Sequence, residues 1–163
     1  MIILVADTSV IIDLERGDLL QVALRGGDTI AVPDLLYDRE LAAHGGPEML
    51  QLGLQVLELT DREVVELQAL KRINARLSVP DCAAYVSARR DDHHLLAGDG
   101  LLRAHAESTG VRCNGVLWLM DRLLESGATT PAILHGALTR MVGHHRCRLP
   151  YPEVKRRLEA WKE

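Results

Sequence analysis

Four acidic residues have positions in the sequence that suit a shared catalytic or metal-binding site, namely Asp7, Glu40, Asp81 and Asp99. Asp7 directly follows the apolar run 2–6, and Asp99 comes just after a second such run, 94–97. If both runs are parallel strands, their carboxyl ends meet at the same edge of a sheet, where open α/β sheets bind their ligands. We therefore expect Asp7 and Asp99 to lie at one edge.

The other two acids lie on helix faces that are otherwise apolar. Glu40 follows Leu36 by four residues, and Asp81 is followed at helical spacing by Ala84 and Ala88. Two bare carboxylates about 4 Å apart repel by roughly 4 kcal/mol at an effective dielectric near 20, so a cluster of four requires a cation or bound protons. Ligands that are all oxygen suit Mg²⁺ or Mn²⁺.

Each acid also has a purely structural interpretation. Asp7 or Ser9 would cap the helix that follows, and Asp81 would interact with a helix dipole. Asp99 would support a turn between two glycines, and Glu40 would be an ordinary surface residue. Any one acid alone is better explained in this way, whereas four that converge on one pocket favour a metal site.

The elements that must position these acids alternate along the chain. Strands are predicted at 2–6, 29–32, 55–59, 94–97 and 111–113. Helices are predicted at 9–24 with a break near Gly17, and at 34–43, 60–76, 78–88, 100–110, 116–126, 130–142 and after 152. Thr60 and Glu63 form a predicted capping box, and Ser78 is a predicted N-cap. This alternation predicts parallel strands joined by crossover helices.

Length and composition predict one domain. The chain has 163 residues, with 1–115 as the expected core and 116–163 as helices packed on the same domain. Aromatic residues make up only 3%, so the core is expected to consist of Leu, Val, Ile and Ala. The apolar runs are too short to cross a membrane. No basic segment precedes the apolar run before Asp7, so a secretory signal peptide is not expected. The three cysteines have no paired spacing, which predicts reduced thiols and a cytoplasmic location.

The net charge of -4 argues against a nonspecific nucleic-acid coat. Basic residues nevertheless concentrate near the C-terminal end, where Glu153 is their one acidic neighbour. They are Arg140, Arg146, Arg148, Lys155, Arg156 and Arg157. This segment is either a tail that binds a polyanion or a solvated face of surface helices, and the sequence leaves both interpretations open.

Five strings of this sequence resemble the PIN-domain family of metal-dependent ribonucleases, which includes the toxins of VapC-type toxin–antitoxin pairs. They are MIILVADTSVIIDL, VPDLLYDREL, LSVPDCAAYVSAR, HHLLAGDGLLRAHAE and VRCNGVLWLMDRLLESG. The resemblance covers nearly the whole chain. It implies a three-layer α/β/α fold with a parallel sheet of about five strands, plus a C-terminal helical extension.

The resemblance also implies a site. The four acids Asp7, Glu40, Asp81 and Asp99 fall on the family's acidic positions, and Ser9 falls on its small hydroxyl position. Asp38 competes with Glu40 for the second acidic position. Leu102 stands where many toxins carry a further Asp, and the helical C-terminus is longer than in compact toxins. The chain therefore looks closer to an orphan PIN branch.

The implied activity is a Mg²⁺- or Mn²⁺-dependent endoribonuclease that cuts single-stranded RNA and leaves a 5′-phosphate and a 3′-hydroxyl. The four acids would act as metal ligands and catalytic groups, and Ser9 and Arg103 are candidate phosphate-binding residues. Implied partners are RNA, an antitoxin protein if the chain is a toxin, and a second copy in a homodimer. The alternative is a catalytically silent PIN-like module that binds nucleic acid or protein.

Two other classes of phosphate enzyme are excluded by single residues. Haloacid-dehalogenase-like phosphatases need an acid at Ser9, and response-regulator receivers need an acid at Thr8 and a Lys after Cys113. Two histidine-containing strings offer further metal ligands. The string 91–94 is better explained as a polar helix end that leads into a strand, and 144–147 as a surface turn.

Overall fold

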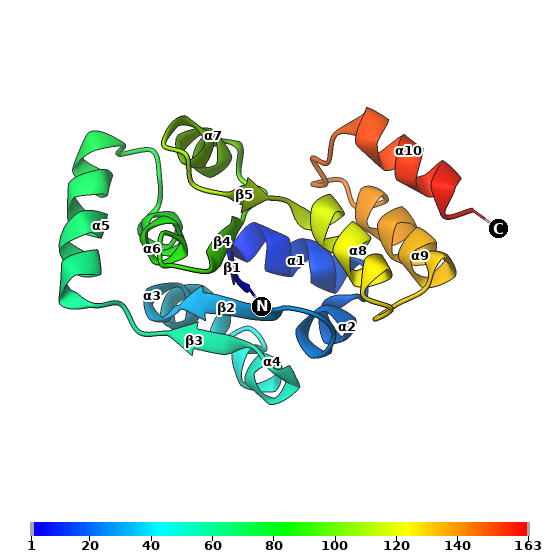
Figure 1. Cartoon of the computed structure of the whole chain (residues 1–163), viewed down its shortest axis with the longest axis horizontal. Coiled ribbons are helices and arrows are strands. Elements are labelled where there is room, and N and C mark those ends of the chain that lie inside the picture. The colour runs from blue at the N-terminus through cyan, green and yellow to red at the C-terminus, as the bar shows by residue number, and fades with distance from the viewer. Residues whose placement is uncertain (1, 163) are drawn as a thin grey trace.

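A five-stranded parallel sheet forms the centre of the molecule, in a computed structural model that describes residues 2–162 (Figure 1). The strand order is β3-β2-β1-β4-β5. The strands are β1 (Ile3–Ala6), β2 (Thr29–Pro33), β3 (Gln55–Leu57), β4 (His93–Leu96) and β5 (Cys113–Asn114). The predicted α/β class with about five parallel strands is therefore confirmed. The last strand begins two residues later than predicted, because Leu95 and Leu96 pair with Cys113 and Asn114.

Helices connect all the strands. They are α1 (Thr8–Arg16), α2 (Leu20–Arg25), α3 (Asp34–Leu36), the π-helix η1 (Tyr37–Leu41), α4 (Gly46–Leu52), α5 (Asp61–Ile73), α6 (Val79–Ala88), α7 (Gly100–Ser108), α8 (Val116–Glu125), α9 (Pro131–Val142) and α10 (Tyr151–Ala160). The capping box of Thr60 and Glu63 is present as predicted, and Ser78 caps α6. Local sequence signals thus located most helix starts correctly.

The break predicted near Gly17 is confirmed, because the chain turns at Gly17 and at Asp18, whose φ is +54°, and 9–24 forms two separate helices. Two other stretches differ from the prediction. The helix predicted at 34–43 becomes α3 followed by η1, in which Ala42 N donates to Tyr37 O. Helix α4 was not predicted, because Gly45 and Gly46 indicated the end of the preceding helix.

The sheet separates two apolar clusters, as a three-layer α/β/α fold requires. Along β1, Leu4 and Ala6 face one cluster while Val5 faces the other. The first cluster includes residues of α1, α2, α4, α8, α9 and α10, and the second includes residues of α5, α6 and α7. Figure 1 shows α5 and α6 on one side of the strands, and α8, α9 and α10 on the other. Alternate strand residues therefore build two cores.

The C-terminal helices pack against the first helix of the chain. Arg140 on α9 donates through Nη2 to Gly17 O at 2.8 Å, at the end of α1. A Cβ at Gly17 would lie 2.5 Å from Met141 Cε, so α9 approaches this turn very closely. Helix α10 is held to α8 by the ion pair between Arg157 and Asp121, at 2.7 Å. Among residues 2–162, no helix is long and apolar enough to cross a membrane.

Candidate active site

Asp7 lies at the carboxyl end of β1 and is buried, with 2% of its surface exposed. Its Oδ1 accepts hydrogen bonds from Ser9 Oγ at 2.8 Å and from Val10 N at 3.0 Å. Its Oδ2 accepts from Gly98 N at 3.1 Å and from Asp99 N at 3.5 Å. Burial raises the pKa of Asp7, and these four hydrogen bonds oppose the rise. The chain thus holds a desolvated carboxylate in a fixed orientation at the sheet edge.

Ser9 supports Asp7 and does not cap the helix. Of the two residues expected to cap α1, Asp7 is the N-cap and accepts from Val10 N, so the expectation for Ser9 is wrong. Ser9 Oγ instead donates to Asp7 and accepts from Gly98 N at 3.2 Å. A Cβ at position 98 would lie 2.6 Å from Ser9 Oγ, so only glycine allows this close approach. Ser9 therefore links the end of β1 to the loop after β4.

Asp99 and Asp81 each begin a helix at the same edge. Asp99 is the N-cap of α7, and its Oδ1 accepts from Leu101 N at 2.9 Å. Asp81 belongs to the capping box of α6, and its Oδ2 accepts from Ser78 N at 3.2 Å. Burial raises the pKa of Asp81, and the negative charges of Asp99 and Glu40 raise it further. This repulsion means that three of the predicted acids share one electrostatic environment.

Glu40 is carried to the site by the π-helix. Leu36 and Leu41 are both buried and are five residues apart, which matches the i→i−5 bonding of η1. Glu40 is half-buried and acts on Asp81, whereas Asp38 is exposed. The π turn therefore buries both leucines while Glu40, which lies between them in sequence, stays half-buried. Such turns are frequently found at functional sites.

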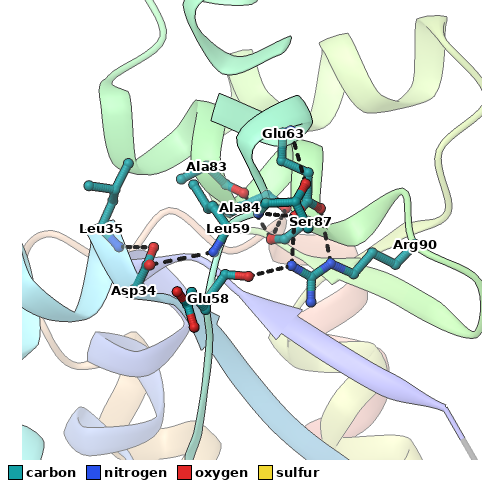
Figure 2. Close-up of polar contacts among 10 residues, drawn as sticks. Asp34, Leu35, Glu58, Leu59, Glu63, Ala83, Ala84, Ser87 and Arg90 are labelled. Atoms are coloured by element: carbon teal, nitrogen blue, oxygen red, sulfur yellow. Dashed lines mark hydrogen bonds and ion pairs between the residues drawn. The ribbon is translucent and has the colours of Figure 1, made fainter. Parts of the chain in front are cut away.

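A polar network fastens together the helices that carry Glu40 and Asp81 (Figure 2). Asp34, at the start of α3, accepts from Leu35 N at 2.8 Å and from Leu59 N at 3.4 Å. Arg90, just after α6, donates to both carboxylate oxygens of Glu63, at 2.9 and 2.6 Å. Arg90 also donates to Glu58 O at 2.8 Å. The loop before α5 thus connects α3 with the end of α6.

The donor set has the chemistry that a hard divalent ion prefers, because all four predicted ligands are carboxylates. Three of them, Asp7, Asp81 and Asp99, also accept hydrogen bonds from backbone N–H groups at helix N-termini. Among residues 2–162, no three His, Cys, Asp or Glu side chains are close enough to ligate one ion. The chemistry of the donor set therefore suits Mg²⁺ or Mn²⁺, and ligation of one ion would require these side chains to turn toward one another.

A groove of about 540 Å³ adjoins these acids and includes Ser9 and Asp99. Asp13, on α1, also lines it, and sequence analysis did not single it out. Burial raises the pKa of Asp13, Arg16 lowers it, and the charge of Asp7 raises it. The sequence feature that could have identified Asp13 is its spacing of four residues from Ser9, which places both side chains on one helix face. Asp13 thus adds a further carboxylate near Asp7.

The predicted phosphate-binding residue Arg103 lies in a different hollow from Ser9. This neighbouring space of about 240 Å³ is lined by Arg103, Gly115 and Trp118 among others. A Cβ at Gly115 would lie 2.7 Å from Arg103 Nη1, so the guanidinium rests directly on this glycine. Leu102, where many toxins have a further Asp, is fully buried in the core.

The two histidine-containing strings and the cysteines lie in the elements expected for them. His93 and His94 begin β4, and 144–147 is a turn after α9, as predicted. All three cysteines are free. Burial raises the pKa of Cys113 to about 11, so this thiol stays protonated near neutral pH.

Comparison with known proteins agrees with the architecture. A family model for the PIN domain matches residues 3–163. No curated protein matches the chain. The match includes β1 with Asp7, the loop with Asp99, and the C-terminal helices as well as the sheet. Because the family model spans nearly the entire chain and the five-stranded parallel sheet has the arrangement expected of that fold, the chain belongs to the PIN-domain family.

Proposed function

We propose that the protein is a divalent-metal-dependent endoribonuclease that hydrolyses phosphodiester bonds in single-stranded RNA. The ligands for Mg²⁺ or Mn²⁺ would be the carboxylates of Asp7, Glu40, Asp81 and Asp99. The observation that carries this proposal is the contact between two of these acids at the sheet edge, where the buried carboxylate of Asp7 accepts hydrogen bonds from Gly98 N at 3.1 Å and from Asp99 N at 3.5 Å. PIN domains are typically metal-dependent nucleases, and this chain belongs to that family.

The carboxylates have different local supports, and these suit different roles. Asp7 is held by four hydrogen bonds and is almost completely desolvated, which suits the most rigid ligand. Asp81 and Asp99 are half-buried and each has one bond to a nearby backbone N–H, so they can reorient more easily. Ser9 keeps Asp7 in position and lines the groove where a phosphate would enter.

The chemistry that Mg²⁺ or Mn²⁺ supplies at a carboxylate site is charge neutralisation at the phosphate and a bound water of lowered pKa. The chain's own contribution is to orient the carboxylates and to receive the RNA backbone. Arg103 would contact a neighbouring phosphate from the second hollow, because no acidic side chain within residues 2–162 pairs with it.

The test is cleavage of end-labelled single-stranded RNA with Mg²⁺, with Mn²⁺ and with EDTA. We expect metal-dependent products with 5′-phosphate ends. Asp7→Asn and Asp99→Asn should each reduce the rate by at least about a hundredfold, because each removes a charge from the ion site. Asp38→Asn is the matched control, since Asp38 is exposed, and it should cleave at nearly the wild-type rate.

Two outcomes would contradict the proposal. One is the absence of cleavage by the wild-type protein in every metal, which would favour the catalytically silent module. The other is equal cleavage by wild type, Asp7→Asn and Asp99→Asn, which would place the activity elsewhere. The antitoxin and the homodimer stay predictions.

A further inference from the structure

A second part of the chain reaches the acidic edge from the C-terminal side. The groove of about 540 Å³ lies between α1 and the loop 143–150 that joins α9 to α10. Helix α1 and the segment after β4 contribute Ser9 and Asp99 to it, and the loop contributes Arg146 and Arg148. The groove therefore brings two arginines from the basic C-terminal segment beside two of the residues in the proposed site.

The guanidinium groups of this groove are available to a ligand. Arg146 and Arg148 are exposed, and neither has a side-chain hydrogen bond or an ion pair within residues 2–162. Arg16, also in the groove, has only a long contact of 3.8 Å with Asp13. Desolvation lowers the pKa of His144, and the charges of Arg16 and Arg146 lower it further. Positive charge is thus concentrated where α1 meets the loop.

The helices on both sides of the loop are anchored, which limits the region that its arginines can reach. At its start, Arg140 on α9 binds Gly17 O at the end of α1. At its end, Arg157 on α10 pairs with Asp121 on α8 at 2.7 Å. Side chains presented by such a loop lose less freedom on binding than those of a mobile tail.

We propose that this groove binds the phosphodiester backbone of the substrate strand next to the cleavage position, with Arg146 and Arg148 as its phosphate-contacting residues. This inference rests on the ribonuclease function proposed above. Unpaired guanidinium groups make bidentate contacts with phosphate oxygens. The chain has a net charge of -4 and only 3% aromatic residues, so backbone contacts at a local basic surface are a better source of affinity than base stacking.

The proposed role is positioning, because Arg146 and Arg148 contact the strand beside the reacting phosphate. Removing them should therefore raise KM and leave kcat nearly unchanged. A purely structural role would change the melting temperature instead. The salt dependence of binding provides a separate readout, because each phosphate contact in a single strand contributes about 0.7 to the slope of log K against log salt.

The experiment compares wild type with the double variant Arg146→Gln/Arg148→Gln. Binding is measured with a single-stranded RNA oligonucleotide in EDTA, where the proposed metal-dependent cleavage cannot occur, at several salt concentrations, and cleavage is measured with the same RNA in Mg²⁺. We expect binding weaker by roughly tenfold or more at low salt. The slope should fall by about 1.4, for two lost contacts. The matched control is Arg62→Gln/Arg72→Gln, which removes the same charge from α5, across the sheet from α9 (Figure 1).

The outcomes separate this inference from the proposed function. RNA cleavage by wild type with the same KM and salt slope in the double variant would overturn the groove assignment and leave the ribonuclease proposal standing. An equal loss in the α5 control would also overturn it, because the effect would then be one of net charge. If wild type neither binds nor cleaves RNA but binds polyglutamate through these arginines, the groove serves an acidic protein segment and both proposals fail.

Discussion

Asp7, Asp81 and Asp99 each combine two roles that the sequence presented as alternatives. Each accepts a backbone hydrogen bond at a helix N-terminus, and each lies at the acidic edge of the sheet. The two roles are compatible, because a cap fixes the position of the carboxylate. The choice between Asp7 and Ser9 as the cap of α1 could not be made locally, since both residue types are good caps. The contact with Gly98, distant in sequence, holds Ser9 against Asp7.

Gly98 is predicted to be essential because of its contact with Ser9. In Gly98→Ala the new Cβ would lie 2.6 Å from Ser9 Oγ, so Ser9 must move away from Asp7. We expect RNA cleavage to fall by about tenfold or more, since small displacements in a catalytic site are costly. Gly100→Ala is the matched control, because no atom lies within 4 Å of its Cβ.

Removing the clash between the new Cβ and Ser9 Oγ tests whether that clash causes the loss of activity in Gly98→Ala. In a double-mutant cycle, Ser9→Ala removes the oxygen that the new Cβ would meet. The double variant should therefore be no less active than Ser9→Ala alone. An additive loss in the double variant would show that Gly98 matters for another reason.

At the scale of elements, the strands and capped helices could be predicted, whereas the turn that carries Glu40 could not. Apolar runs that alternate with helical patterns predicted the parallel sheet, and Thr60 and Ser78 predicted where two helices begin. The π-helix η1 was missed because Leu36 and Glu40 fit ordinary helical spacing equally well. Packing of both Leu36 and Leu41 into the core decides this conformation. Helix α4 was missed because Gly and Pro are also loop signals.

The π turn predicts which of two neighbouring acids matters. Glu40 is half-buried and interacts with Asp81, whereas Asp38 is exposed. Glu40→Gln should therefore reduce metal-dependent cleavage by about a hundredfold. Asp38→Asn should stay within about twofold of wild type, and a reversed order in the two rates would show that Asp38 serves the site.

The network in Figure 2 predicts a pH dependence of stability. Hydrogen bonds from Arg90 lower the pKa of Glu63 below its ordinary value of 4.5. A lowered folded-state pKa means that the stabilisation is complete above the unfolded-state pKa and is lost as pH falls through the folded-state value. Glu63→Gln should therefore cost about 1–2 kcal/mol of unfolding free energy at pH 7.

Urea unfolding of wild type and Glu63→Gln between pH 7 and pH 3 measures this effect. The difference between the two proteins should shrink as the pH falls below about 4.5. Glu66→Gln, on the same helix, breaks only more exposed ion pairs and should change stability by less than about 1 kcal/mol. A constant difference across this pH range would show that the pair with Arg90 is not its source.

For the whole molecule, the arrangement of charge is compatible with the proposed action of an acidic protein on RNA. The net charge is -4, and Asp7 and Asp99 follow the carboxyl ends of β1 and β4. The C-terminal helices pack on α1 and present Arg146 and Arg148 beside that edge. The division into a core at 1–115 and an extension at 116–163 on one domain stays a prediction. On this view the extension contributes to the groove as well as to the core.

The measurement that tests the central claim most directly is the melting temperature of the protein with and without Mn²⁺, for wild type, Asp99→Asn and Asp38→Asn. An ion that binds only the folded state should raise the melting temperature of wild type and Asp38→Asn by about 5–10 °C at a hundredfold excess over Kd. The rise should largely disappear in Asp99→Asn, because that variant lacks one of the four carboxylates. An unchanged wild-type melting temperature, or an equal rise in all three proteins, would contradict a metal site at this edge.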